Sequence, residues 1–107
     1  MRRNSAARND AYGFNLATML AGVLRSQESG DYGARNQLVY SALACAAMDG
    51  CECGIRFNED DHEWPIIYIV LPSGEVSWTV QQFAPKADGH TKEENSARIR
   101  KFVERFL

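Results

Sequence analysis

Apolar and polar positions follow a clear order between Trp64 and Val80, where the chain reads WPIIYIVLPSGEVSWTV. The Pro-Ser-Gly in the middle predicts a tight turn, because proline presets φ and Gly74 accepts a positive φ. The stretch therefore predicts a hairpin of two antiparallel strands, over residues 64–71 and 75–80.

The two predicted strands differ in their faces. The first is apolar on both sides, which is typical of a central strand that is covered twice. The second has a dry side around Trp78, which predicts a core position for that ring, and an opposite, wet side that carries Ser77 and Thr79.

A third strand is predicted before the hairpin, over residues 51–57, because apolar and other residues alternate there. The residues that point to its apolar side are Cys51, Cys53, Ile55 and Phe57. Such alternation predicts a half-buried strand, with Ile55 and Phe57 in the core beside small, buried thiols. The acidic segment NEDDHE, residues 58–63, predicts the loop between this strand and the hairpin.

Helical spacing of apolar residues predicts two helices before the strands. The first begins at Asn9 or Asp10 and ends near Ser26, and residues 1–9 are expected to be frayed. The second covers residues 34–49 and ends at a glycine.

A last helix follows the strands. Thr91 and Glu94 form a capping box that predicts its start. Arg98, Lys101 and Arg105 follow one side of it, which is typical of a solvated face. The order α-α-β-β-β-α predicts a single α+β domain over residues 1–107, in which a three-stranded antiparallel meander packs on helices.

This order leaves one face of the central strand without an assigned cover. An exposed apolar stripe edged by polar groups would favour binding of a partner. Alternatively, the N-terminal helix or the segment 81–90 covers that face.

Composition narrows the class of protein. The chain has 107 residues and a net charge of −2, which is the wrong sign for a dedicated nucleic-acid binder. The N-terminal apolar stretch is too short and too polar to cross a bilayer, and three cysteines, an odd number, favour a reducing compartment. We therefore expect a cytoplasmic protein with no membrane contact.

Two clusters of side chains offer candidates for chemistry. The possible zinc ligands are Cys45, Cys51, Cys53, His62 and His90. Their spacing matches no zinc finger or knuckle, so we expect no metal and no cofactor. Asp88 and His90 could act in acid–base catalysis by a small hydrolase, but no nucleophile is indicated nearby, which favours a role in ordering the loop. We expect no catalytic residue.

Part of the chain resembles the double-stranded-RNA-binding domain. Residues 45–107 follow that family's α-β-β-β-α order, and GHTKEENSARIRKFVERFL lies where its second helix starts, with Lys92 at one position of its basic cluster. The resemblance implies a nucleic-acid-binding module, which is the alternative function.

A second resemblance covers residues 64–102. The motifs LPSGEVSW, from Leu71 to Trp78, and DGHTKEE, from Asp88 to Glu94, resemble small accessory proteins of phages and prophages. That resemblance implies a mobile-element protein, a class in which inhibitors of host defence, including anti-CRISPR proteins, are frequent.

The resulting hypothesis is a non-enzymatic protein, monomeric or homodimeric, that occupies a surface of a host protein or nucleoprotein complex in the host cytoplasm. An acidic loop would suit an arginine-bearing partner, and an outward tryptophan would anchor it. The residues expected to contact the partner are Glu59, Asp60, Asp61, Glu63, Trp64, Tyr68, Thr79, Asp88 and His90.

Overall fold

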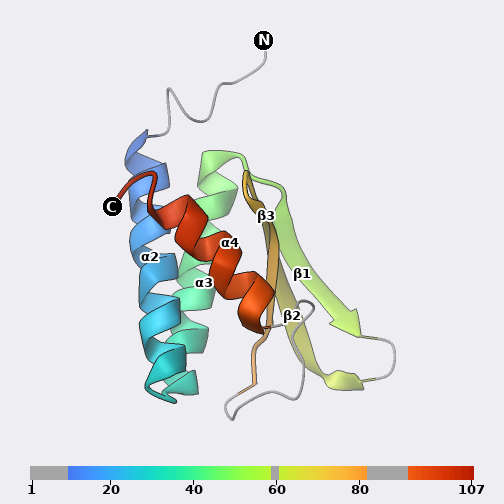
Figure 1. Ribbon diagram of the computed structural model, residues 1–107. Helices are drawn as coiled ribbons and strands as arrows, with labels where there is room; N and C mark the ends of the chain where they lie inside the picture. Colours follow the sequence, from blue (N-terminus) through green and yellow to red (C-terminus); the bar gives the residue numbers. More distant parts are fainter. Residues whose placement is uncertain (1–9, 59–60, 82–91) are drawn as a thin grey trace.

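The computed structural model describes residues 10–58, 61–81 and 92–107. Its elements follow the predicted order α-α-β-β-β-α (Figure 1), so the α+β class is confirmed. They are α2 (Asp10–Glu28), α3 (Tyr32–Asp49), β1 (Cys53–Asn58), β2 (Asp61–Leu71), β3 (Gly74–Thr79) and α4 (Lys92–Val103).

The two long helices begin and end close to their predicted positions. Helix α2 continues two residues beyond Ser26. Helix α3 begins two residues earlier than predicted, because the Asp31 side chain accepts a hydrogen bond from the Ala34 N–H at 3.0 Å and so caps its first turn. Gly50, in the left-handed region with φ 84°, ends α3 as expected.

The three strands form one antiparallel sheet in the order β1-β2-β3. Strand β2 begins at Asp61, because Asn58 pairs with Asp61 across a local irregularity in the β1–β2 register. The prediction that 58–63 is all loop is therefore wrong for residues 61–63 and for Asn58. Gly74 closes the hairpin with φ 130°, a region open to glycine at little cost.

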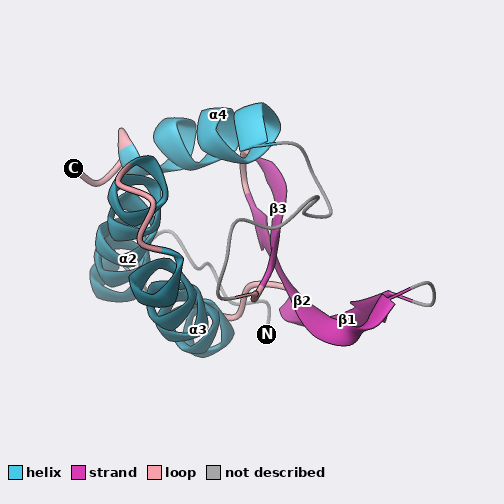
Figure 2. Ribbon diagram, turned by 90° about the horizontal axis from the view of Figure 1, so that it is seen from below, coloured by secondary structure: helices cyan, strands magenta, loops and turns pink. Residues whose placement is uncertain are grey.

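Helices α2 and α3 cover one face of the sheet, and α4 lies along β3 and against α2 (Figure 2). Trp78 is fully buried between them, as the sequence predicted. The other fully buried apolar residues are Leu16, Ala17, Leu20, Val23, Val39, Ala42, Ala46, Ile67, Ile69, Val76 and Ile99. The sheet therefore has an inner face, toward α2 and α3, and an outer face.

Side chains of α4 satisfy the outward backbone groups of β3. The Asn95 amide accepts a hydrogen bond from the Ser77 N–H and donates one to the Ser77 carbonyl, so it replaces a neighbouring strand at that point. Arg98 donates to the Glu75 carbonyl, and the Ser73 hydroxyl donates to the Arg98 carbonyl at 2.7 Å. Arg98 therefore belongs to the α4–β3 contact, and its assignment to a solvated face was wrong.

Helix α3 continues this cover of the β3 edge. The buried Arg35 donates from Nη2 to the Thr79 carbonyl at 2.6 Å, and Asn36 donates from Nδ2 to the Gln81 carbonyl at 2.8 Å. Ser77 is fully buried and Thr79 is 7% exposed. The predicted wet side of this strand is therefore wrong at both residues.

Candidate functional site

Strand β1 extends beyond the part of the sheet that the helices cover. Cys53, Ile55 and Phe57 lie on the inner face, because Ile55 pairs with the inner-facing Ile67. Nevertheless Ile55 is 50% and Phe57 65% exposed. The prediction that both are core residues is wrong, because on this face of β1 Cys53 packs against the core whereas Ile55 and Phe57 do not.

The backbone of β1 alternates in direction. The Val70 N–H donates to the Glu52 carbonyl at 2.8 Å, so Gly54 and Arg56, which follow at intervals of two, also face β2 with their backbone groups. The N–H and C=O groups of the residues between them then point away from β2. We call these three residues, Cys53, Ile55 and Phe57, the β1 edge.

The outer face carries a stacked arrangement of three side chains from three strands. Arg56 lies over the ring of Tyr68, with its guanidinium carbon 3.8 Å from the ring centre, and reaches Glu75 with two hydrogen bonds of 3.0 and 3.1 Å. The hydrogen bonds to Glu75 raise the pKa of Arg56, whose guanidinium is charged throughout the ordinary pH range. We call Arg56, Tyr68 and Glu75 the platform.

Gly54 makes room for the platform. A Cβ at Gly54 would lie 3.2 Å from the Tyr68 ring, closer than side chains usually pack. The absence of a side chain at Gly54 therefore leaves room for the Tyr68 ring, on which Arg56 stacks. Ile66 and Val70 of β2 lie on the same face, and each is half-buried.

Of the residues expected to contact a partner, the structure places Tyr68 on the outer face, and Trp64 is half-buried in β2 beside the irregular part of the β1–β2 register. Thr79 is buried, and its carbonyl accepts from Arg35, so its expected role as a contact is wrong. Asp61 and Glu63 lie in β2, but their side chains are outside the described part. The remaining expected contacts, Glu59, Asp60, Asp88 and His90, lie outside the described residues.

The three cysteines are free and half-buried. Burial raises the pKa of the Cys53 thiol, which disfavours the thiolate that a zinc site needs. Within the described residues, no cluster of three or more His, Cys, Asp or Glu side chains could hold a metal ion.

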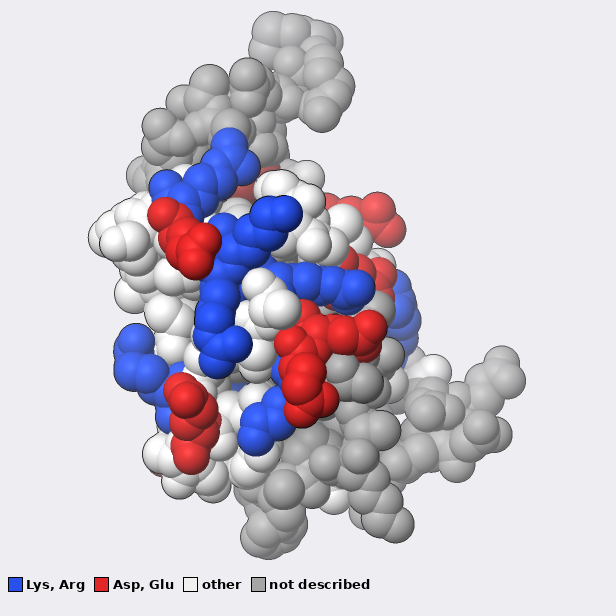
Figure 3. All heavy atoms as spheres, in the orientation of Figure 1, with Lys and Arg blue, Asp and Glu red and all other residues white. Residues whose placement is uncertain are grey.

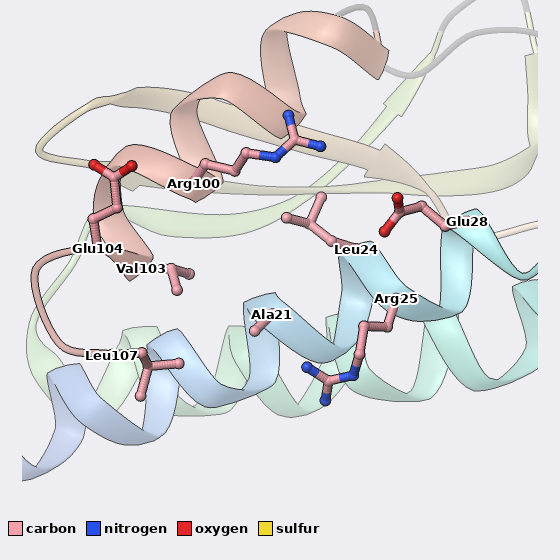
Figure 4. Close-up of a pocket in the computed structure, with 8 residues that line it drawn as sticks. All are labelled: Ala21, Leu24, Arg25, Glu28, Arg100, Val103, Glu104 and Leu107. Atoms are coloured by element: carbon pink, nitrogen blue, oxygen red, sulfur yellow. The ribbon is translucent and has the colours of Figure 1, made fainter.

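A groove of about 430 Å³ lies between α2 and α4 (Figure 4). Its apolar lining comes from Ala21, Leu24, Val103 and Leu107, and its charged lining from Arg25, Glu28, Arg100 and Glu104. In Figure 4 the guanidinium groups of Arg25 and Arg100 extend in different directions. The groove therefore presents no converging pair of cations to an anion.

Two residues that join α3 to the end of β3 were not predicted from the sequence. Arg35 and Asn36 stand at the start of α3, where polar residues usually face water. Their spacing from the buried Val39, at i+4 and i+3, was the signal that placed them on the inner side of the helix. Gly54 offered a second signal, since a glycine within a strand often marks a close approach by another group.

No protein-family model, curated protein or solved structure matches this chain. None of the helices in the described ranges has the length and apolar character needed to span a bilayer.

Proposed function

We propose that this protein acts without catalysis, by binding a host protein or nucleoprotein complex through the outer face of its sheet. In this proposal it is a mobile-element protein that inhibits a host defence complex, in the manner of an anti-CRISPR protein, in the host cytoplasm. The proposed origin rests on the resemblance of residues 64–102 to phage and prophage accessory proteins.

The platform is the observation that carries the proposal. Three strands contribute one side chain each, and two hydrogen bonds together with the stacking hold the Arg56 guanidinium over Tyr68. A fixed aromatic and arginine surface suits protein recognition, because little side-chain entropy is lost when a partner binds. Trp64, four residues before Tyr68 in β2, is also half-buried.

The proposal is tested with cells that carry an active CRISPR system and are challenged with a targeted phage. Expression of the wild-type protein is expected to restore plaque formation, and the purified effector complex is expected to bind the protein. Tyr68→Ala and Arg56→Ala remove the platform and should abolish both effects. Lys101→Ala, an exposed change on α4, is the control and should abolish neither.

Circular dichroism and thermal unfolding show whether these variants are folded, so that the loss of the binding surface can be distinguished from unfolding. Unchanged immunity in the presence of folded wild-type protein, together with no binding to the effector complex, would overturn the proposal. Full inhibition by a folded Tyr68→Ala variant would show that the platform is not the contact.

One observation favours the alternative, a nucleic-acid-binding module. The elements from α3 to α4 follow the order of the double-stranded-RNA-binding domain. Arg100 and Lys101 are exposed on α4, and Arg105 is exposed just beyond its end. Figure 3 shows basic side chains gathered on the face that α4 occupies, with acidic side chains among them. In a mobility-shift assay at low salt, retardation of duplex RNA that weakens with added salt would support this alternative.

A further inference from the structure

The two edges of the sheet differ in how their backbone groups are satisfied. The outward carbonyls of Glu75, Ser77 and Thr79 in β3, and that of Gln81 just beyond it, accept hydrogen bonds from side chains of α3 and α4. Strand β1 is the opposite edge, and no described helix or strand lies along it (Figure 2). Open edges invite pairing with another strand, and proteins commonly block them with lysine, proline or an inward-pointing charge. The β1 edge carries none of these.

The sequence of β1 is complementary to itself. In an antiparallel pair centred on Ile55, that residue faces Ile55 of a second copy, and Phe57 faces Cys53 on either side of the centre. All three have outward backbone groups, so this register forms about six hydrogen bonds between the two copies. Their side chains share one face, so the pair also joins apolar surface to apolar surface.

The charge distribution also fits this register. Arg56 would face Gly54 of the second copy, so no like charges stand directly opposite each other. The ion pair with Glu75 draws the Arg56 guanidinium across β2 toward β3 and away from the β1 edge. The β1 edge can therefore pair with the β1 edge of a second copy without a charged side chain at the two-fold axis.

We infer that the β1 edge is a dimerisation surface, at which β1 of a second copy of this chain pairs antiparallel with Ile55 at the two-fold axis. The two sheets join into one of six strands, with both helical layers on the same side. The exposed surface of Ile55 and Phe57 is covered in part by the same residues of the second copy. A strand of another protein would need apolar side chains at the same spacing to pair in this way. Strand β1 of a second copy has that spacing.

The oligomeric state of the purified full chain tests this inference, by light scattering or sedimentation over a wide concentration range. The wild type is expected at twice the chain mass of 12.0 kDa. Ile55→Lys and Ile55→Glu each place two like charges at the axis and should return the mass to that of one chain. Mixing the two variants should restore a 1:1 dimer, since opposite charges then face each other.

Two control variants distinguish pairing through the β1 edge from nonspecific association of exposed apolar residues. Met48→Lys and Phe14→Lys place the same charge on other exposed apolar residues, 58% and 49% exposed, and should remain dimeric. A wild type with the mass of one chain throughout would overturn the inference. So would an Ile55→Lys variant that keeps the double mass, or a mixture of the two charged variants that stays monomeric.

The dimer and the proposed function fail separately, because the β1 edge and the outer face are different surfaces. A monomeric wild type that still inhibits the defence complex would overturn the dimer alone. A dimer that has no effect on immunity and binds no effector complex would overturn the proposed function alone.

Discussion

Asn95 is the residue on which the contact between α4 and the sheet depends. Its amide meets both the N–H and the C=O of Ser77, and the two residues are 2% and 0% exposed. A strand edge normally finds such a pair of hydrogen bonds only in another strand. Together with the contacts that Arg98, Arg35 and Asn36 make along β3, this side chain closes an edge that could otherwise pair, which leaves β1 as the open edge among the described strands.

Replacing Asn95 with Ala is expected to lower the free energy of unfolding by about 2–3 kcal/mol, because two buried backbone groups of Ser77 lose their partners. Urea unfolding measures the change. The exposed Lys101→Ala on the same helix serves as the control and should stay within about 0.5 kcal/mol of the wild type. Equal stability of the two variants would contradict the role given to Asn95.

At the scale of elements, the β2–β3 hairpin and α4 are fitted to each other. Gly74 has φ 130°, and a Cβ there would lie 2.8 Å from the Arg98 side chain, which donates to the carbonyl of the next residue. The turn thus needs glycine for two reasons, the backbone conformation and the approach of α4. Propensity alone reveals only the first.

Gly74→Ala is expected to destabilise the protein by about 1–3 kcal/mol, since alanine is strained at this φ and also displaces Arg98. Gly33→Ala is the matched comparison. Gly33 lies in the first turn of α3 with its nearest neighbouring atom 3.7 Å away, so alanine fits and should stabilise by about 0.5–1 kcal/mol. Thermal unfolding distinguishes the two, and shifts of the same sign would refute this explanation.

At the scale of the whole molecule, Arg35 joins the helical layer to the sheet. It is fully buried, its guanidinium stacks 5.0 Å from the Tyr32 ring centre, and it spans from α3 to the Thr79 carbonyl at the end of β3. It also holds the Asn36 amide oxygen at 2.8 and 3.0 Å, which directs the amide nitrogen of Asn36 toward Gln81. One buried cation therefore orients two contacts between layers.

Arg35→Ala is expected to cost about 3 kcal/mol, from the lost hydrogen bond to Thr79 and the cavity left behind. Equilibrium denaturation measures it, and Arg25→Ala, an exposed arginine on α2, is the comparison. If both arginine variants have the same free energy of unfolding, the contact that Arg35 makes between α3 and β3 does not contribute to stability.

Local patterns were enough to predict the order and type of the elements. Helical spacing, the glycine that ends α3 and the Pro-Ser-Gly turn each depend on neighbours in the sequence, and the structure has all three. The start of β2 was missed because its pairing with Asn58 extends into a segment whose composition is typical of a loop. Within the candidate site, Tyr68 and Trp64 were predicted, while Gly54 and Arg56 entered through contacts between strands.

The sequence by itself determined which side of each strand a residue occupies, because alternation along a strand is a property of the backbone. Only the tertiary structure decided what lies over that side. Ser77 and Thr79 are polar yet buried under α3 and α4, whereas Ile55 and Phe57 are apolar yet exposed, because the helical cover does not extend over this part of β1. Lateral placement of helices on a sheet depends on packing between distant segments, and no local pattern contains it.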